Sequence, residues 1–452
     1  MTTTTATADA DLVPPLGPPP RVRKARASER TLANGLRVLV IRQPSVPLVE
    51  LRLRIPFAGT RRTLQTHPAR SSVLSDTMLA GTESRSQVEI AEFLQGLGAD
   101  LSVSTDADRL LVSGTTLAPG LTPLLGLLAE ILTGASYPST EVGVERDRLA
   151  QRLSIARSQP SVLVREALAR RMFGEHPYAH ELPEADAVRR VTAGQIRRLH
   201  ADRVLPAGSL LILVGDLAPA RTLDRVEQAL DGWRAAGEAV AAPTLPAVQP
   251  ARPLIVHRDG SVQSAIRLGL PALTRDDEGY PAYQLANLIF GGYFSSRLTE
   301  NIREDKGYTY TPSSRVDHTP SGSSLVVQAD VATEVTAPAL LEMNYELGRM
   351  ATGTVTETEL EAVRQYAIGT LALSIATQSG LASTVSALAG VGQGLDWLHE
   401  HPRRLAKVTL DEVVEQAHRL LTPGSAVTVV LGDAAEVVDP VGRLGAVEVE
   451  RP

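Results

Sequence analysis

The sequence contains no cysteine among its 452 residues, and this absence removes several kinds of chemistry. Without thiols the chain can form no disulfide, no cysteine nucleophile and no zinc–thiolate site. Any metal would therefore have to bind through His, Asp or Glu side chains. A chain without cysteine is compatible with the cytosol, and we expect a cytoplasmic protein.

Excess positive charge and long apolar runs are also missing. The formal net charge of -6 argues against a nucleic-acid partner, which would need a basic face. No apolar run is long enough to span a membrane, so we expect no membrane partner. Residues 1–28 form a Thr/Ala/Pro tract followed by basic residues, without the apolar core of a secretory signal, and we expect a disordered tail. No GxGxxG or Walker loop follows the first strand, so nucleotide binding is not expected.

An Ala- and Pro-rich segment, "AAGEAVAAPTLPAVQPARP" at residues 235–253, lacks any amphipathic period and is predicted to be a linker. It separates an N-terminal domain, residues 29–234, from a C-terminal domain, residues 254–450. The two domains resemble each other. The strand and helix from Arg109 align without a gap with those from Ser324, at an offset of about 215 residues. This pattern favours an internal duplication over two unrelated α+β domains.

Each predicted domain opens with two apolar strands, and helical blocks then lie between further strand pairs. A second match supports the duplication, because Pro/Gly turns after Arg203 and Arg419 each lead into a buried strand that stops at Gly-Asp. The expected fold class is α+β, with two homologous α/β-sandwich domains in which helices cover one face of a mixed sheet.

The stretch "LANLIFGGYFSSRLTENIREDKGYTYTPSSR", residues 285–315, closely resembles the second-domain signature of the pitrilysin/insulinase metallopeptidase superfamily. In that signature a helix ends in Gly-Gly and is followed by Ser-Arg-Leu, Arg-Glu and a Gly-Tyr. The duplicated halves, the linker and "GEHPYAH" at Gly174 fit the short type, similar to bacterial and mitochondrial processing peptidases. The resemblance covers nearly the whole chain after residue 30 and implies that family's fold.

The stretch "SSVLSDTMLAGT", residues 71–82, is predicted to be a helix and aligns with the family's zinc helix. There an H-x-x-E-H motif supplies two His ligands and a Glu base, and a Glu on a later helix is the third ligand. The resemblance places Ser72, Ser75 and Asp76 at the three motif positions and Arg152 near the third ligand. Serine is a poor zinc ligand and Arg152 would repel a cation, so we expect this chain to bind no zinc and no other cofactor.

Other histidines offer no convincing replacement site. His176 and His180 have the i, i+4 spacing of paired ligands, but Pro177 between them favours a turn. The "HEHP" stretch at His399 is followed at once by proline and is typical of a solvated helix end.

In active family members, a second-domain Arg and a Tyr seven residues later reach the substrate at the zinc centre. The matching residues are Arg303 and Tyr310, which the resemblance identifies as catalytic. A preplaced Tyr hydroxyl would stabilise the charge on a peptide carbonyl oxygen, and an Arg would hold backbone carbonyls. Without the resemblance, Arg303 would be read as a surface ion pair near Glu304 and Tyr310 as a packed strand residue.

The residues around this pair have predicted roles as well. Tyr308 competes for the hydroxyl role and would share a face with Tyr310 on an extended strand, so only the spacing selects Tyr310. Arg297 is expected to support the glycine-rich turn. Four small residues are expected to contact an extended peptide: Gly291, Gly292, Ser295 and Ser296.

Together these features predict the zinc-free subunit of a heterodimeric zinc metallopeptidase, inactive alone. A homologous H-x-x-E-H subunit would supply the zinc and the base, and this chain would supply Arg303 and Tyr310 for hydrolysis of peptides or of leader and precursor segments. Two alternatives remain: a structural pseudoenzyme, as in the core of a respiratory complex, and a peptide-binding chaperone.

Overall fold

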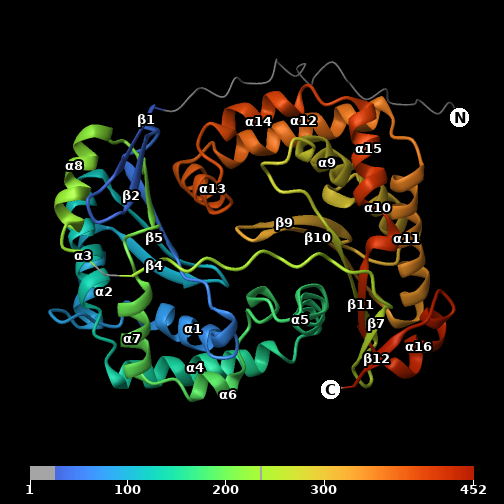
Figure 1. The fold of residues 1–452 in the computed structure, drawn as a ribbon, viewed down its shortest axis with the longest axis horizontal. Helices are drawn as coiled ribbons and strands as arrows, with labels where there is room; N and C mark the ends of the chain where they lie inside the picture. The colour runs from blue at the N-terminus through green and yellow to red at the C-terminus, as the bar shows by residue number, and fades with distance from the viewer. Residues whose placement is uncertain (1–25, 235–236, 452) are drawn as a thin grey trace, which may run out of the picture.

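The structure is a computed structural model that describes residues 26–234 and 237–451, arranged as two halves that face each other (Figure 1). Residues 1–25 of the predicted tail lie outside the described residues. Arg26–Ser28, which the sequence assigns to the tail, instead form the first half of strand β1. Within the described part of the predicted linker, residues 237–253, there is no helix or strand.

Each half contains a six-stranded mixed sheet. The N-terminal sheet has the order β1-β2-β6-β3-β5-β4, and the C-terminal sheet has the order β12-β7-β11-β8-β10-β9. The N-terminal strands are β1 (Arg26–Thr31), β2 (Arg37–Arg42), β3 (Leu48–Pro56), β4 (Asp100–Thr105), β5 (Arg109–Leu117) and β6 (Leu210–Gly215). The C-terminal strands are β7 (Leu254–His257), β8 (Gln263–Pro271), β9 (Ser313–Thr319), β10 (Gly322–Ala332), β11 (Val427–Gly432) and β12 (Glu448–Glu450).

The two sheets repeat one topology, which confirms the predicted pair of homologous domains. The run β2-β6-β3-β5-β4 corresponds to β7-β11-β8-β10-β9, with a parallel first pair and antiparallel pairs after it. Even the register is kept. Leu53 faces Val112 in one sheet, and Leu268 faces Val327 in the other, each 215 positions later (268 against 53, 327 against 112).

Helices connect and cover the strands in both halves. The N-terminal helices are α1 (His67–Thr77), α2 (Gln87–Leu97), α3 (Leu121–Gly134), α4 (Ser139–Ala156), α5 (Pro160–Phe173), α6 (Ala185–Arg189), α7 (Ala193–Arg203) and α8 (Pro219–Leu230). The C-terminal helices are α9 (Tyr280–Asn287), α10 (Arg297–Thr299), α11 (Thr336–Thr352), α12 (Glu357–Ser374), α13 (Gln378–Gly390), α14 (Trp397–Leu405), α15 (Leu410–Leu420) and α16 (Ala434–Gly442). Reciprocal capping boxes, such as that of Thr356 and Glu359 at α12, satisfy backbone groups where several of these helices begin.

Among the residues that the structure describes, no single helix is both long and apolar enough to cross a membrane. By length and composition alone, only α12 and α13 taken together as a bent pair would pass.

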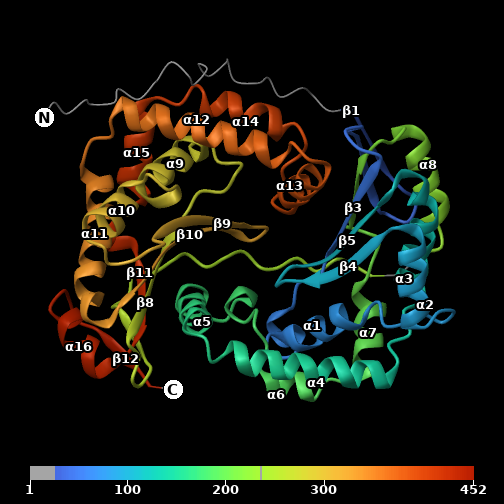
Figure 2. The same cartoon turned by 180° about the vertical axis from the view of Figure 1, so that it is seen from behind.

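The halves exchange one helix each, and this exchange ties them together. In β11, Val427, Val429 and Leu431 pack on α5 of the N-terminal half, whereas Val430 faces the helices of its own half. Reciprocally, α13 of the C-terminal half packs on β3 and β6 (Figures 1 and 2). Because both faces of β6 and β11 are covered, both strands are buried along their whole length. Each sheet therefore carries its own helices on one face and a borrowed helix on the other.

Glycine permits close packing where each borrowed helix meets its sheet. A Cβ atom at Gly269 on β8 would lie 2.1 Å from the Sδ atom of Met172 on α5. At the other exchange contact, a Cβ atom at Gly390 on α13 would lie 2.8 Å from Cζ of Arg54 on β3. Each contact therefore pairs a glycine with a long side chain, and the glycine lies on the strand in one case and on the helix in the other.

Replacing Gly269 by Ala is expected to destabilise the protein by about 1–3 kcal/mol, because the added methyl group must displace buried Met172. Gly143→Ala on α4 is the matched control, since a Cβ there meets no atom within 4 Å and should stabilise the helix by about 0.5–1 kcal/mol. Thermal or denaturant unfolding measures both variants. Equal effects of the two substitutions would contradict the packing argument.

The interpretation of "HEHP" as a solvated helix end is wrong. These residues lie inside α14, which continues past Pro402, and His401 is buried. Its ring stacks on Trp397 at 4.0 Å between centroids, and its Nε2 atom hydrogen-bonds Oε1 of Gln284 at 2.7 Å. Burial, together with nearby arginines, lowers the pKa of His401 to about 3, so this ring is a neutral core residue.

Candidate functional site

Helix α1 confirms the helix predicted for this stretch as far as Thr77. Val73, Leu74 and Met78 are fully buried against the N-terminal core. Pro68 stands in the first turn of the helix, where its missing N–H has no consequence. After Thr77 the chain turns toward Gly81, whose φ of +152° lies at the edge of the region that favours glycine. The fold therefore uses this helix as a core element.

The polar positions of α1 make contacts that a zinc site would not allow. The Oγ atom of Ser72 donates to Pro68 O at 2.9 Å, and that of Ser75 donates to Ser72 O at 2.9 Å. Asp76 accepts a hydrogen bond from Arg152 on α4 at 2.6 Å. Partial burial raises the pKa of Asp76, although the guanidinium of Arg152 lowers it. The serines thus bond their own helix, and the one carboxylate is paired with a fixed positive charge, so these residues do not fit zinc.

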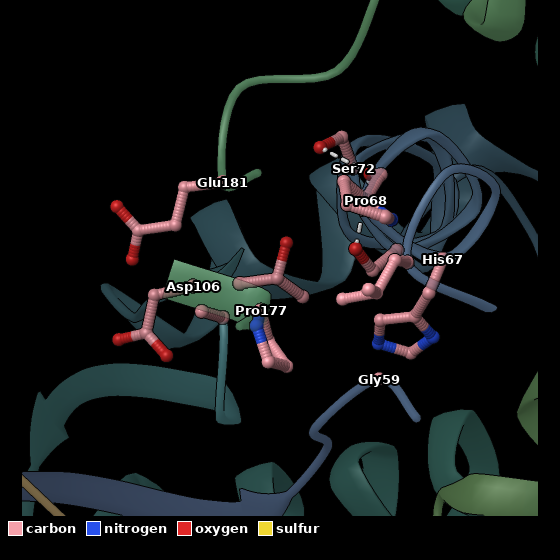
Figure 3. Close-up of a pocket in the computed structure, with 11 residues that line it drawn as sticks. Gly59, His67, Pro68, Ser72, Asp106, Pro177 and Glu181 are labelled. Carbon is pink, nitrogen blue, oxygen red and sulfur yellow. Dashed lines mark hydrogen bonds between the residues drawn. The ribbon is translucent and has the colours of Figure 1, made fainter. Parts of the chain in front are cut away.

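A small pocket of about 40 Å³ lies beside this helix. Figure 3 shows Ser72 and His67 on one side of it and the carboxylates of Asp106 and Glu181 on the other. This volume has room for water but not for the backbone of a peptide.

The side chain of His67, at the start of α1, is also engaged in a hydrogen bond within the domain. Its Nε2 atom hydrogen-bonds Phe57 O at 2.7 Å, and burial lowers its pKa to about 4. The ring is therefore neutral near pH 7 and directed at the backbone of its own domain.

We predict that removing metal has no effect on the stability of this chain. Adding EDTA or zinc should leave its unfolding temperature unchanged, because Ser72, Asp76 and Arg152 offer no set of ligands. The matched variant is Ser72→His/Asp76→His/Arg152→Glu, which places His, His and Glu side chains on the same two contacting helices. Its unfolding temperature is expected to become dependent on EDTA. A wild-type chain that loses stability in EDTA would contradict the assignment.

Two further histidines, His176 and His257, are engaged in structural contacts. His176 lies at a 3₁₀ turn, as predicted, and its Nε2 atom hydrogen-bonds Pro243 O at 2.7 Å in the segment between the halves. His257, Asp259 and Asp433 are close enough to share a cation. However, Nδ1 of His257 accepts from the Ala434 N–H, and Asp433 caps α16.

The glycine-rich motif ends a helix, because a π-helical segment, Leu288–Gly292, continues α9, and a short turn at residues 293–296 then leads to α10. Gly291 is buried, and a Cβ there would lie 2.9 Å from Oγ of Ser314. Ser296 is also buried, and its Oγ atom accepts from the Thr299 N–H to cap α10. Gly292 is partly exposed and Ser295 is exposed. Of the four predicted peptide contacts, Gly292 and Ser295 are therefore accessible, whereas Gly291 and Ser296 shape the turn.

Arg297 anchors this turn to α12. Its Nε and Nη2 atoms donate to the two carboxylate oxygens of Glu359 at 2.7 and 3.0 Å, and Nη2 also donates to Thr354 O. Burial alone would raise the pKa of Glu359, but hydrogen bonds from Arg297 and Thr356 hold it at about 2. The structure gives Arg297 the supporting position that the sequence suggests.

Arg303 and Tyr310 lie together at the surface of the C-terminal half. The Cζ atom of Arg303 lies 4.8 Å from the centroid of the Tyr310 ring, and Tyr310 is 77% exposed. Arg303 also makes the ion pair with Glu304 that the sequence would suggest without the resemblance, at 3.3 Å from Nε. Within the described residues, the two terminal nitrogens of Arg303 make no hydrogen bond. The pair therefore presents free donors to an incoming group.

The prediction that Tyr308 and Tyr310 share a face is wrong. Strand β9 begins only at Ser313, and Gly307 has a φ of +65°, so the two tyrosines precede the strand in an irregular segment. Tyr308 packs against the core, whereas Tyr310 is exposed. Tyr310 is therefore distinguished from Tyr308 by its exposed position as well as by its spacing from Arg303.

One residue beside the pair was not singled out from the sequence. Phe294, in the same motif, has its ring centroid 4.5 Å from Cζ of Arg303 and is 67% exposed. The available signal was an aromatic residue between two glycines and two serines, in a turn where burial was not to be expected.

Comparisons with known proteins agree with this arrangement. Residues 37–186 match the insulinase family, peptidase family M16, and residues 190–366 match the peptidase M16 inactive domain. An uncharacterized zinc protease of Streptomyces coelicolor is 25% identical over 403 residues, which cover 86% of each chain. An uncharacterized zinc protease of Bacillus subtilis is 22% identical over 387 residues, covering 85% of this chain and 90% of the relative.

Solved structures share the fold. The peptidase M16 inactive domain from Pseudomonas fluorescens superposes with a TM-score of 0.82 at 22% identity, covering 90% of this chain and 98% of that one. A protease from Helicobacter pylori superposes with a TM-score of 0.81 at 18% identity, covering 90% and 99%. Since the motif, the duplicated topology and the two family matches coincide, the chain belongs to the insulinase family of peptidases, M16.

Proposed function

We propose that this chain is the zinc-free subunit of a heterodimeric peptidase, whose other subunit is a homologue with an intact H-x-x-E-H helix and its zinc. The observation that carries the proposal is a contrast within the molecule. Ser72, Ser75 and Asp76 on α1 are committed to their own helix or to Arg152, whereas Arg303 and Tyr310 keep free donors at the surface.

Tyr310 would act on the reacting carbonyl of the peptide. Negative charge develops on that oxygen as the carbonyl carbon is attacked, and a hydroxyl already in place can donate a hydrogen bond to it. The exposure of Tyr310 leaves its hydroxyl available for this role. The terminal nitrogens of Arg303 would donate to backbone carbonyls on either side and thus fix the position of the peptide.

The substrate class that suits this surface is an extended peptide, such as a leader or precursor segment. Among the described strands, β9 is an edge strand that pairs only with β10, and it begins three residues after Tyr310. A peptide that adds to this edge by backbone hydrogen bonds would run beside Tyr310. Gly292 and Ser295 are accessible residues next to Tyr293 and Phe294, and they would contact such a peptide. We further propose a cytoplasmic location, with which the lack of cysteine is compatible.

Reconstitution tests the proposal. This chain and the H-x-x-E-H homologue from the same organism are purified separately, and cleavage of a fluorogenic peptide library is measured for each alone and for an equimolar mixture. Activity is expected only in the mixture, together with a 1:1 complex in sizing experiments. Full activity of the homologue alone would overturn the proposal.

Two other outcomes would support the alternatives. A stable complex without peptide cleavage would favour a structural pseudoenzyme. Peptide binding by this chain without any complex would favour a chaperone.

A further inference from the structure

We propose that Phe294 is a positioning residue for Arg303, an inference that rests on the proposed function. Its ring lies against the guanidinium, with 4.5 Å between the ring centroid and Cζ, while the Tyr310 ring contacts the same group at 4.8 Å. The two rings are largely exposed, yet the Arg303 side chain between its neighbours is only 21% exposed. The rings of Phe294 and Tyr310 therefore cover the Arg303 guanidinium and are not buried in the hydrophobic core.

An aromatic ring suits this task better than an acidic partner. The face of the ring attracts the guanidinium without accepting hydrogen bonds from its N–H groups. Glu304 pairs with Nε at 3.3 Å, and within the described residues the terminal nitrogens make no hydrogen bond, so they stay available for peptide carbonyls. A carboxylate stacked in place of Phe294 would compete for these donors.

The turn that carries Phe294 is itself held at both ends. The Tyr293 ring packs on Tyr366 of α12 at 5.3 Å between centroids. On the other side, Ser296 is buried as the cap of α10, and its backbone N–H donates to Tyr293 O at 3.2 Å. Phe294 is thus an exposed side chain on a fixed backbone, which is what a positioning role requires.

Scattered exposed apolar residues are common and need no function, so the test must separate stacking from mere exposure. In the isolated chain, the Hε resonance of Arg303 is expected to be shifted upfield by the ring currents. Phe294→Leu should move it toward its random-coil position, whereas Phe294→Trp should not. An unchanged resonance in Phe294→Leu would overturn the stacking, and this readout does not depend on any partner.

In the reconstituted heterodimer, Phe294→Leu is expected to raise KM about two- to fivefold with kcat nearly unchanged, because an exposed cation–π contact contributes that much. Phe294→Trp should restore the wild-type KM. The substitution should have no further effect in an Arg303→Ala background. Val262→Ala removes another exposed apolar residue, 82% exposed, and is the control without effect.

The outcomes distinguish the positioning role of Phe294 from the proposed function of the chain. If Arg303→Ala impairs cleavage but Phe294→Leu does not, the positioning role is overturned and the proposed function stands. If Arg303→Ala leaves cleavage unchanged, the proposed function itself is overturned. An effect of Phe294→Leu that persists in the Arg303→Ala background would also contradict action through Arg303.

Discussion

Replacing Tyr310 by Phe is expected to lower the kcat of the reconstituted heterodimer by about 10²- to 10³-fold, since loss of one preplaced oxyanion donor typically has this effect. The substitution removes a single oxygen atom from a side chain that is mostly exposed. Stability of the chain should therefore change by less than about 0.5 kcal/mol. Single-turnover cleavage of a chosen peptide measures the chemical step directly.

Tyr308→Phe is the matched control for this prediction. Tyr308 is two residues away but packs against the core, so cleavage should continue at the wild-type rate. Equal losses from the two substitutions would show that the segment as a whole matters rather than the Tyr310 hydroxyl.

The second large effect concerns the ion pair that supports the turn. Glu359→Ala is expected to lower the free energy of unfolding by about 3–5 kcal/mol, because it leaves the Arg297 guanidinium, 9% exposed, without its partner. Asp186→Ala breaks the exposed Arg189–Asp186 pair and should cost less than about 1 kcal/mol. Denaturant unfolding of the two variants and the wild type makes the comparison. If both variants lost less than about 1 kcal/mol of unfolding free energy, the argument that Glu359 compensates the buried charge of Arg297 would be contradicted.

This pair also predicts a pH dependence. The pKa of Glu359 is about 2 in the folded chain, below its ordinary value of 4.5. Because the folded pKa is depressed, the stabilisation is fully present above about pH 4.5 and is lost as the pH falls from 4.5 toward 2. Unfolding measured across this range should show a shallower pH dependence in Glu359→Ala than in the wild type. Parallel curves would contradict the assignment.

Much of the fold was predictable from the sequence because its patterns are local. Buried and more exposed residues alternate along β5 and β10, and this alternation can be recognised directly in the sequence. The common offset of the helices that follow these strands can be recognised in the same way. The exchange of α5 and α13 was not predictable, since a helix's apolar face does not reveal which sheet covers it. The continuous apolar runs of β6 and β11 indicate that both faces of these strands are buried, but they do not identify the helix that covers the second face.

The contacts of the candidate site residues were not predictable from the sequence. The family resemblance selected Asp76 and Arg152 separately, and only the packing of α1 on α4 shows that they form an ion pair. His401 was misread because a following proline is typical of a helix end, whereas the stacking on Trp397 and the contact with Gln284 stabilise a helix that continues through it. The contact of Phe294 with Arg303 was not predictable because it depends on where the Arg303 side chain lies in the fold.

A competition experiment tests the central claim most directly. A limiting amount of the H-x-x-E-H subunit is mixed with this chain and with increasing Tyr310→Phe chain, and the rate of peptide cleavage is measured. If this chain supplies Tyr310 to its partner's site, the variant occupies the partner without contributing the hydroxyl, and equal amounts of the two should halve the rate. A rate that stays constant as the variant is added would contradict the account.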